Sequence, residues 1–147
     1  MKGLKRRKMN EVRIGVVGYC PPSRFDKAEA MRMIKDAYDK IGLQNPDAPK
    51  KVVSGLTNVG VLALAYKEAI VRGWKTAGIA CSKANEYECF PVDEKVIVGN
   101  EWGEESQTFL NSIDVLVRVG GGSQSKREIL EAKANGKPVF EYDLASE

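Results

Sequence analysis

The sequence contains no histidine, and this absence excludes several kinds of chemistry. Ser-His-Asp and Cys-His catalysis, zinc or iron sites with imidazole ligands, and proton transfer through imidazole are all ruled out. Any catalysis must therefore use carboxylates, Lys, Tyr, Ser, Cys or backbone amides. We expect no metal site and no required cofactor.

Cysteine is scarce, and long apolar runs are missing. Cys20, Cys81 and Cys89 form neither an even set for disulfides nor a C-x-x-C pair, which is typical of reduced thiols in a cytosolic protein. No apolar run is long enough for a signal peptide or a membrane span. We therefore expect a cytoplasmic protein with no membrane partner.

The chain also lacks a strong excess of charge of one sign. Charged residues make up 29% of the 147 residues, but the formal net charge is only +3, which does not indicate nucleic-acid binding. The positive excess comes from residues 2–8, so the rest of the chain is slightly acidic. We predict a disordered basic tail over residues 1–10, with a phosphate-seeking arm as the alternative, and a nucleotide-binding domain over residues 11–147.

Strand and helix patterns alternate along that domain. Continuous apolar segments predict buried strands over residues 12–17, 51–55, 75–81, 114–120 and 137–143, with a further strand near 95–99. Helical spacing predicts helices over residues 26–41, 58–73, 104–113 and 125–136. This alternation favours an α/β fold: a single-domain, Rossmann-like three-layer sandwich with a mostly parallel sheet.

Three strand-end loops contain the candidate site residues. In parallel sheets ligands bind at the carboxyl ends of the strands, where the segments GYCPPSR, SGLTNVG and GGGSQS fall. Small residues let backbone amides approach a ligand, and a helix N-terminus favours a phosphate. The candidate phosphate-binding residues are Gly18, Ser23, Gly55, Thr57, Asn58, Gly60, Gly121, Gly122, Ser123, Gln124 and Ser125. Asn58 and Ser125 are equally good helix caps.

Two further features of the loops bear on the ligand. The polar segment after the third strand contains Tyr87 and Phe90, and these rings, with Trp102, either stack on a flat ligand or pack in a core or interface. No G-x-G-x-x-G follows the first strand, and no P-loop G-K-[ST] is present. The sequence therefore indicates neither an ordinary dehydrogenase nor a P-loop NTPase.

Two segments resemble the motifs of a known family. Residues 55–69, GLTNVGVLALAYKEA, resemble its G-G-G-x-x-G-x-M segment, and residues 112–129, SIDVLVRVGGGSQSKREI, resemble its S-D-A-x-I-x-L-P-G-G-x-G-T-x-x-E motif. The family is that of the Lonely Guy-type nucleotide phosphoribohydrolases, within the SLOG superfamily. The wider group includes DNA-processing Rossmann proteins, molybdenum-cofactor carrier proteins and domains that sense nucleotide derivatives. The resemblance covers most of the chain from Val12 to Asp143.

The resemblance assigns roles to residues of the second motif. Gly121 and Gly122 stand at the paired glycines, Ser125 at the threonine and Glu128 at the catalytic glutamate. The residues alone favour a first-turn acid that stabilises a helix N-terminus, and only with the resemblance do the two interpretations of Glu128 become equal, so both stay open. The resemblance also implies a homodimer.

The same motif contains departures from the family. Gly120 replaces its proline, Gln124 replaces the glycine before the threonine, and Glu105 occupies the position where an R-K dipeptide supplies a catalytic arginine. An acid repels a phosphate that an arginine would pair with. Arg24 and Arg118 are the residues that would replace the missing arginine in space.

Two functions follow from these observations. The departures favour a carrier, a sensor or a degenerate family member that binds a nucleotide, a nucleotide-derived ligand or a pterin through phosphate-cradling loops. The alternative is a nucleoside 5'-monophosphate phosphoribohydrolase in which Glu128 assists cleavage of the N-glycosidic bond. In both cases the partner is a small molecule, and we expect no nucleic acid partner.

Overall fold

Six apolar segments form one parallel sheet in the computed structural model, which describes residues 3–5 and 10–147. The strands cross the sheet in the order β4-β3-β2-β1-β5-β6, and every neighbouring pair is parallel. Their bounds are β1 (Val12–Gly18), β2 (Lys50–Ser54), β3 (Lys75–Ala80), β4 (Glu94–Ile97), β5 (Val115–Val119) and β6 (Val139–Tyr142).

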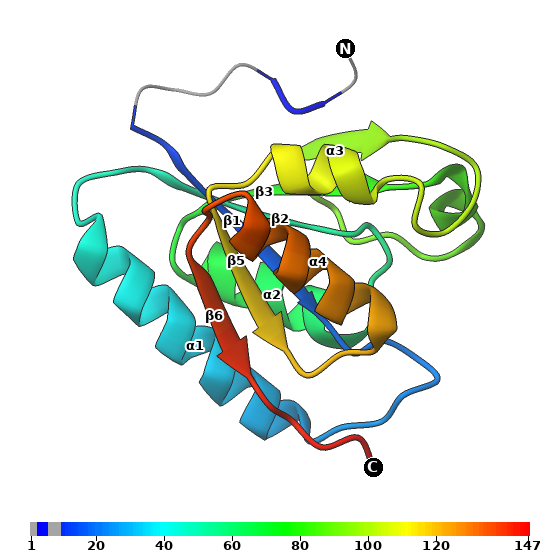
Figure 1. The fold of residues 1–147 in the computed structure, drawn as a ribbon, viewed down its shortest axis with the longest axis horizontal. Helices are drawn as coiled ribbons and strands as arrows, with labels where there is room; N and C mark the ends of the chain where they lie inside the picture. The colour runs from blue at the N-terminus through cyan, green and yellow to red at the C-terminus, as the bar shows by residue number, and fades with distance from the viewer. Residues whose placement is uncertain (1–2, 6–9) are drawn as a thin grey trace.

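Four helices cover the two faces of this sheet (Figure 1). They are α1 (Lys27–Gln44), α2 (Gly60–Val71), α3 (Ser106–Asn111) and α4 (Ser123–Ala134), and a 3-10 turn follows β3 at Ser82–Glu86. The α1 and α2 side chains enclose one apolar core with β1, β2 and β5, and the α3 and α4 side chains enclose a second core on the other face. The predicted three-layer α/β sandwich is confirmed, and its sheet is parallel throughout.

Helix boundaries differ from the prediction where backbone groups act as caps. The first helix continues past Gly42 to Gln44, because the Asn45 N–H closes the last turn on the carbonyl groups of Ile41 and Gly42. The second helix begins at Gly60 rather than Asn58, and the Val61 N–H donates to the Tyr19 carbonyl. The loop after β1 therefore lies directly against the start of α2.

The predicted basic tail falls largely outside the described residues, since residues 1–2 and 6–9 are not among them. Within the described part, the Lys5 N–H donates to Glu94 (2.8 Å) and the Lys5 carbonyl accepts from Arg13 (2.6 Å). Residues 3–5 thus lie beside the N-terminal ends of the strands. No helix in residues 3–5 and 10–147 is long and apolar enough to cross a membrane.

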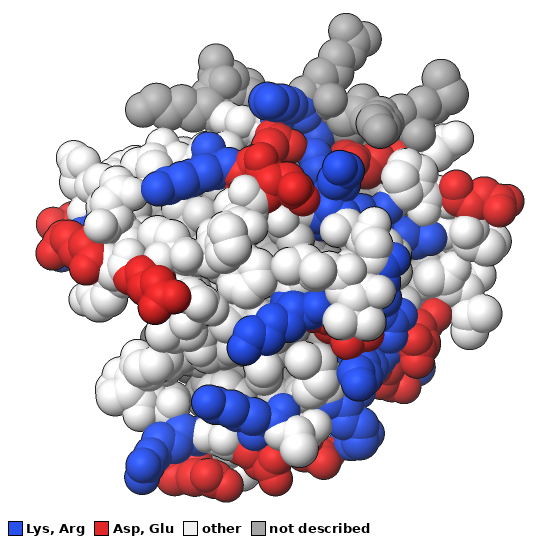
Figure 2. Space-filling view, turned by 180° about the vertical axis from the view of Figure 1, so that it is seen from behind, with Lys and Arg blue, Asp and Glu red and all other residues white. Residues whose placement is uncertain are grey.

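The surface carries charges of both signs. Figure 2 shows Lys and Arg side chains beside Asp and Glu side chains over much of the face opposite to that in Figure 1. Ion pairs such as Lys40–Asp36 (2.9 Å) and Arg72–Asp39 (2.8 Å) neutralise charges on α1 and α2. Such a mixed surface differs from the continuous basic stripe that attracts a phosphate backbone.

Candidate functional site

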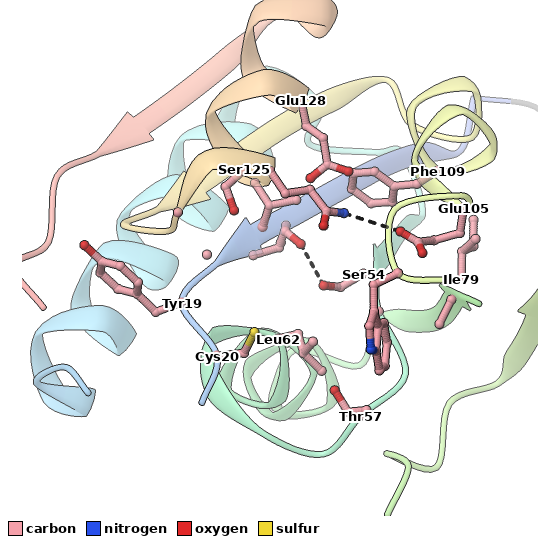
Figure 3. A pocket seen from close by; sticks show the side chains of 18 of the residues that line it. Tyr19, Cys20, Ser54, Thr57, Leu62, Ile79, Glu105, Phe109, Ser125 and Glu128 are labelled. Carbon is pink, nitrogen blue, oxygen red and sulfur yellow. Dashed lines mark hydrogen bonds between the residues drawn. The ribbon is translucent and has the colours of Figure 1, made fainter. Parts of the chain in front are cut away.

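The cavity that the predicted loops form lies where the strand connections change direction across the sheet. The connection after β1 leads to β2 on one side, whereas the connection after β5 leads to β6 on the other. This arrangement opens a crevice at the carboxyl ends of β1 and β5, the place where doubly wound sheets bind ligands. The crevice contains a cavity of about 400 Å³. The loops after β1, β2 and β5 and residues of α3 and α4 line this cavity (Figure 3).

Most of the predicted site residues line this cavity. They come from the loops after β1, β2 and β5 and from the start of α4, which are far apart in the sequence and converge as the sequence predicts. The lining includes Gly18, Ser23, Gly55, Thr57, Gly122, Ser123, Gln124, Ser125 and Glu128.

Asn58, Gly60 and Gly121 do not line the cavity but shape its rim. The Asn58 side chain neither caps α2 nor faces the cavity, because its amide donates to Glu88 (3.1 Å). Gly60 has a φ of 65°, and a Cβ there would lie 2.4 Å from the Tyr19 carbonyl oxygen. Gly121 has a φ of 102°, and a Cβ there would lie 2.6 Å from the Ser125 hydroxyl. Both glycines therefore permit close packing of the loops.

The N-terminal residues of α4, Ser123 to Ser125, line the cavity. The helix begins at Ser123, and its N-cap, Gly122, supplies no side-chain cap. First-turn N–H groups have no acceptor within their own helix, and they form the positive end of the helix dipole. Among the described residues, no Lys or Arg belongs to the cavity lining. The α4 N-terminus is therefore the feature of this cavity best suited to an anion.

The part of the cavity lined by Glu105 and by the second turn of α4 is acidic. Glu105 and Glu128 are both more than nine-tenths buried, and in Figure 3 they lie away from Tyr19 and Cys20. The Gln124 amide donates to Glu105 (3.4 Å) and to the Ser106 hydroxyl (3.3 Å), and that hydroxyl donates to Glu128 (2.7 Å). Hydrogen bonds through Gln124 and Ser106 thus connect the two carboxylates.

The environment of Glu128 shifts the pKa of its carboxyl group. Burial raises the pKa of the Glu128 carboxyl, and the charge of Glu105 raises it further, although hydrogen bonds from Ser106 and Gln124 oppose this shift. Because α4 starts at Ser123, Glu128 lies in the second turn of the helix, and no acid stands in the first turn. The interpretation of Glu128 as a first-turn acid is therefore wrong.

The Glu128→Gln variant tests the cost of burying this carboxyl. A folded-state pKa above the unfolded one means that ionisation opposes folding, so stability falls as the pH rises through the folded pKa. At pH 8 we expect the variant to be more stable than the wild type by about 1 kcal/mol. Near pH 4 the advantage should shrink, because the wild-type carboxyl takes up its proton. Thermal melts across this range measure the difference.

Glu131→Gln is the matched control, because Glu131 lies exposed on the same helix. We expect this variant to show no comparable dependence on pH. A difference between wild type and Glu128→Gln that stays constant from pH 4 to pH 8 would contradict a raised pKa for Glu128.

Within residues 3–5 and 10–147, no arginine takes the place of the missing family arginine. Arg118 lies buried within β5, where its guanidinium donates to the Gly120 carbonyl (2.9 Å) and pairs with Asp143 (2.8 Å). Arg24 does not line the cavity either. The departure at Glu105 is thus uncompensated among the described residues.

The aromatic residues that the sequence left open divide between core and cavity. Phe90 is buried against Tyr66, with ring centroids 5.0 Å apart. Trp102 lines the cavity, is 51% exposed, and lies 6.0 Å from the ring of Tyr87. Trp102 is therefore the ring best placed to stack on a flat ligand.

Apolar side chains complete the wall, and sequence reasoning did not assign them to the site. Leu62 from α2, Ile79 from β3 and Phe109 from α3 all line the cavity. Their helical or strand periodicity is that of ordinary core residues, so no local signal separates them from the core. The cavity thus combines apolar walls with polar groups at two ends, as small-molecule sites commonly do.

A buried tyrosine fixes the β2 edge of the site. The Tyr66 hydroxyl accepts from the Ser54 N–H (3.0 Å) and lies within hydrogen-bonding distance of the Gly55 and Ala77 carbonyl oxygens (2.6 and 2.9 Å). The Ser54 hydroxyl donates to the Val16 carbonyl (2.7 Å). These bonds connect the carboxyl end of β2 to β1 and β3.

The remaining chemistry of the site is limited. Among residues 3–5 and 10–147, no group of three or more Cys, Asp and Glu side chains is arranged to hold a metal ion. Cys20, Cys81 and Cys89 are all free thiols, and only Cys20 lines the cavity. The cavity therefore offers hydrogen-bonding groups, a helix N-terminus suited to an anion and two buried carboxyl groups.

Comparisons by sequence and by structure differ in outcome. No protein-family model matches the chain. No curated protein matches it significantly in sequence. Solved structures do match over most of its length, and each of those described next covers at least 87% of the chain.

The similar structures include carriers of one cofactor. The molybdenum cofactor binding protein from the phototrophic bacterium Rippkaea orientalis is 25% identical, with a TM-score of 0.70 over 91% of this chain and 77% of that one. The molybdenum cofactor carrier protein from Chlamydomonas reinhardtii is 24% identical, with a TM-score of 0.66 over 89% and 76%. A structural-genomics target, TM1055, is 26% identical, with a TM-score of 0.67 over 87% and 72%.

These likenesses bear on the family that the two motifs indicate. The group named from the motifs includes the molybdenum-cofactor carrier proteins, and two of the structural neighbours are described as binding or carrying that cofactor. The resemblance inferred from residues 55–69 and 112–129 is therefore confirmed at the level of the family.

Proposed function

We propose that this chain, a Rossmann protein of the Lonely Guy-like group, is a carrier that holds a phosphate-bearing pterin or nucleotide without transforming it. This proposal rests on how polar and apolar groups are distributed in the cavity. Amides at the α4 N-terminus suit a phosphate, apolar walls suit a flat ring, and an acid stands where a hydrolase of this group has its arginine.

The structural neighbours support a ligand of the pterin type. Two of them are described as binding or carrying the molybdenum cofactor, a pterin-type group. The residues of this cavity fit such a group in kind, since Gly122 and Ser123 lie where a phosphate would meet helix amides and Trp102 offers a stacking surface. The carrier would bind, orient and shield the ligand.

A second candidate function is hydrolysis of a nucleoside monophosphate. The buried Glu128 carboxyl favours it, because a raised pKa lets a carboxyl retain a proton that it can donate to a leaving base. Against it, the part of the chain that the structure describes contributes no Lys or Arg to the cavity lining that would stabilise the phosphate during the reaction. This function therefore ranks below that of a carrier.

One incubation separates the two functions. Purified protein is mixed with a panel of nucleoside 5'-monophosphates, and free base is measured by chromatography over several hours. We expect each nucleotide to be recovered intact, with no more free base than in the Glu128→Gln variant. Release of base that depends on Glu128, at least about 100-fold above the variant, would establish the hydrolase instead.

Two further expectations stay predictions. The resemblance implies a homodimer, which sedimentation velocity of the full chain would test. The cysteine content indicates the cytoplasm, and fractionation of cells that express the protein would test this location.

A further inference from the structure

Two of the positions at which the sequence departs from its family meet inside the cavity. Glu105 stands in place of an arginine and Gln124 in place of a glycine, 19 residues apart in the chain. In the fold the Gln124 amide donates to the Glu105 carboxylate, as the dashed line in Figure 3 shows. The two exchanges together convert one side of the cavity from a cationic site into a site rich in acceptors.

The acceptors on this side are held in place by the protein. One oxygen of Glu105 accepts from the Gly103 N–H (3.0 Å), and Gln124 lies between the other oxygen and Ser106. Ser106 in turn holds Glu128. A ligand on this side therefore meets preorganised carboxylate oxygens rather than flexible surface acids.

The chemistry of these groups determines which ring they would recognise. A carboxylate accepts two parallel N–H groups well, as it does from a guanidinium. A fused heterocycle with an amino group beside a ring N–H presents the same pair of donors. Pterins and guanine share this edge, which is the 2-amino-4-oxo edge in the numbering of the pyrimidine ring and is 2-amino-6-oxo in purine numbering. Adenine and hypoxanthine lack the pair. A ring that fails to satisfy buried acceptors loses affinity because desolvated polar groups stay unpaired.

We propose that Glu105 is the specificity-determining residue of the cavity and selects, with Gln124 and Glu128, rings that carry the 2-amino-4-oxo edge. The ring would lie between Phe109 and Trp102, both of which line the cavity. This inference rests on the proposed function, since it names the ligand edge that the carrier recognises. It also explains why an acid at this position is compatible with ligand binding, because the acid would face the ring rather than the phosphate.

Guanosine and inosine 5'-monophosphates form a matched pair of probes, because they differ only in the 2-amino group. Isothermal titration of the full chain at pH 7.5 measures the affinity for each probe. We expect guanosine monophosphate to bind at least about tenfold more tightly, the effect of one charge-assisted hydrogen bond. In Glu105→Gln the preference should fall below about threefold, because the amide has one acceptor oxygen and a donor that opposes the ligand's own N–H.

The control is Glu101→Gln, which removes the same charge from an exposed side chain that pairs with Lys83 outside the cavity. It should retain the wild-type preference. Thermal melts establish that Glu105→Gln is folded, and its amide oxygen can still accept from the Gly103 N–H.

The outcomes distinguish this inference from the proposed function. Equal binding of the two probes by the wild type, or an unchanged preference in Glu105→Gln, would overturn the selective role of Glu105 and leave the carrier function standing. Failure of both probes to bind would also overturn it. The carrier function is tested separately, by identifying the small molecule that the purified protein retains.

Discussion

Replacement of Gly122 by Asp is expected to abolish ligand binding while the protein stays folded. Gly122 is the N-cap of α4, its φ is −97°, and a Cβ there meets no atom within 4 Å. The backbone therefore accepts a side chain at this position. An aspartate would cap the helix by accepting from first-turn N–H groups, which adds a few tenths of a kcal/mol of stability over glycine.

The same aspartate would occupy the proposed anion site. It would place a carboxylate where the phosphate lies, and it would engage the amides that the phosphate needs. We expect the affinity for guanosine monophosphate to fall at least about 100-fold, the sum of lost hydrogen bonds and charge repulsion. Isothermal titration measures the affinity, and a thermal melt measures the stability.

Gly122→Asn is the matched control, since asparagine caps the helix as well but has no charge. It should bind more weakly than the wild type and more tightly than Gly122→Asp. Wild-type affinity in the aspartate variant would show that the phosphate does not lie at the α4 N-terminus.

Tyr66→Phe is expected to cause the largest loss of stability among single-atom deletions in this protein. The Tyr66 side chain is fully buried, and its hydroxyl lies within hydrogen-bonding distance of backbone groups of Ser54, Gly55 and Ala77. Burial raises the pKa of this hydroxyl well above its usual value, so it stays a neutral donor. Its removal leaves the Ser54 N–H and a carbonyl without a partner, which costs about 2–4 kcal/mol.

Tyr38→Phe is the comparison that isolates this effect. Tyr38 is equally buried, but its hydroxyl donates to one group only, the Ala65 carbonyl of α2 (3.0 Å). We expect a loss of about 1 kcal/mol there. Urea unfolding of both variants gives the two free energies, and equal losses would contradict the role of Tyr66 in joining the strand ends.

The fold was predictable because its signals are local and repeated. Apolar strands such as 12–17 and 114–120 read as buried segments from their own residues, and glycine-rich loops follow them at one edge of the sheet. Parallel order then brings the loops after β1, β2 and β5 together without further information. The candidate cavity could be placed on this basis alone.

The details that the sequence did not show depend on contacts between distant residues. Asn58 was an equal candidate for cap and ligand contact, but the start of α2 is closed by the Tyr19 carbonyl, which no local pattern reveals. The bond between Glu105 and Gln124 joins the N-cap of α3 to the first turn of α4. Arg118 was a candidate substitute for the missing arginine until the fold showed it paired with Asp143. Such partners can be identified only from the folded structure, in which distant segments lie side by side.

The central claim is that this cavity retains an intact, phosphate-bearing ring at the α4 N-terminus. Native mass spectrometry of gently purified wild type and Gly122→Asp, each followed by denaturation and analysis of the released molecule, tests it most directly. The account predicts a wild-type complex that releases an intact phosphorylated pterin or nucleotide, and a variant without it. Spectra that show the same ligand in both proteins, or none in the wild type even after incubation with guanosine monophosphate, would contradict it.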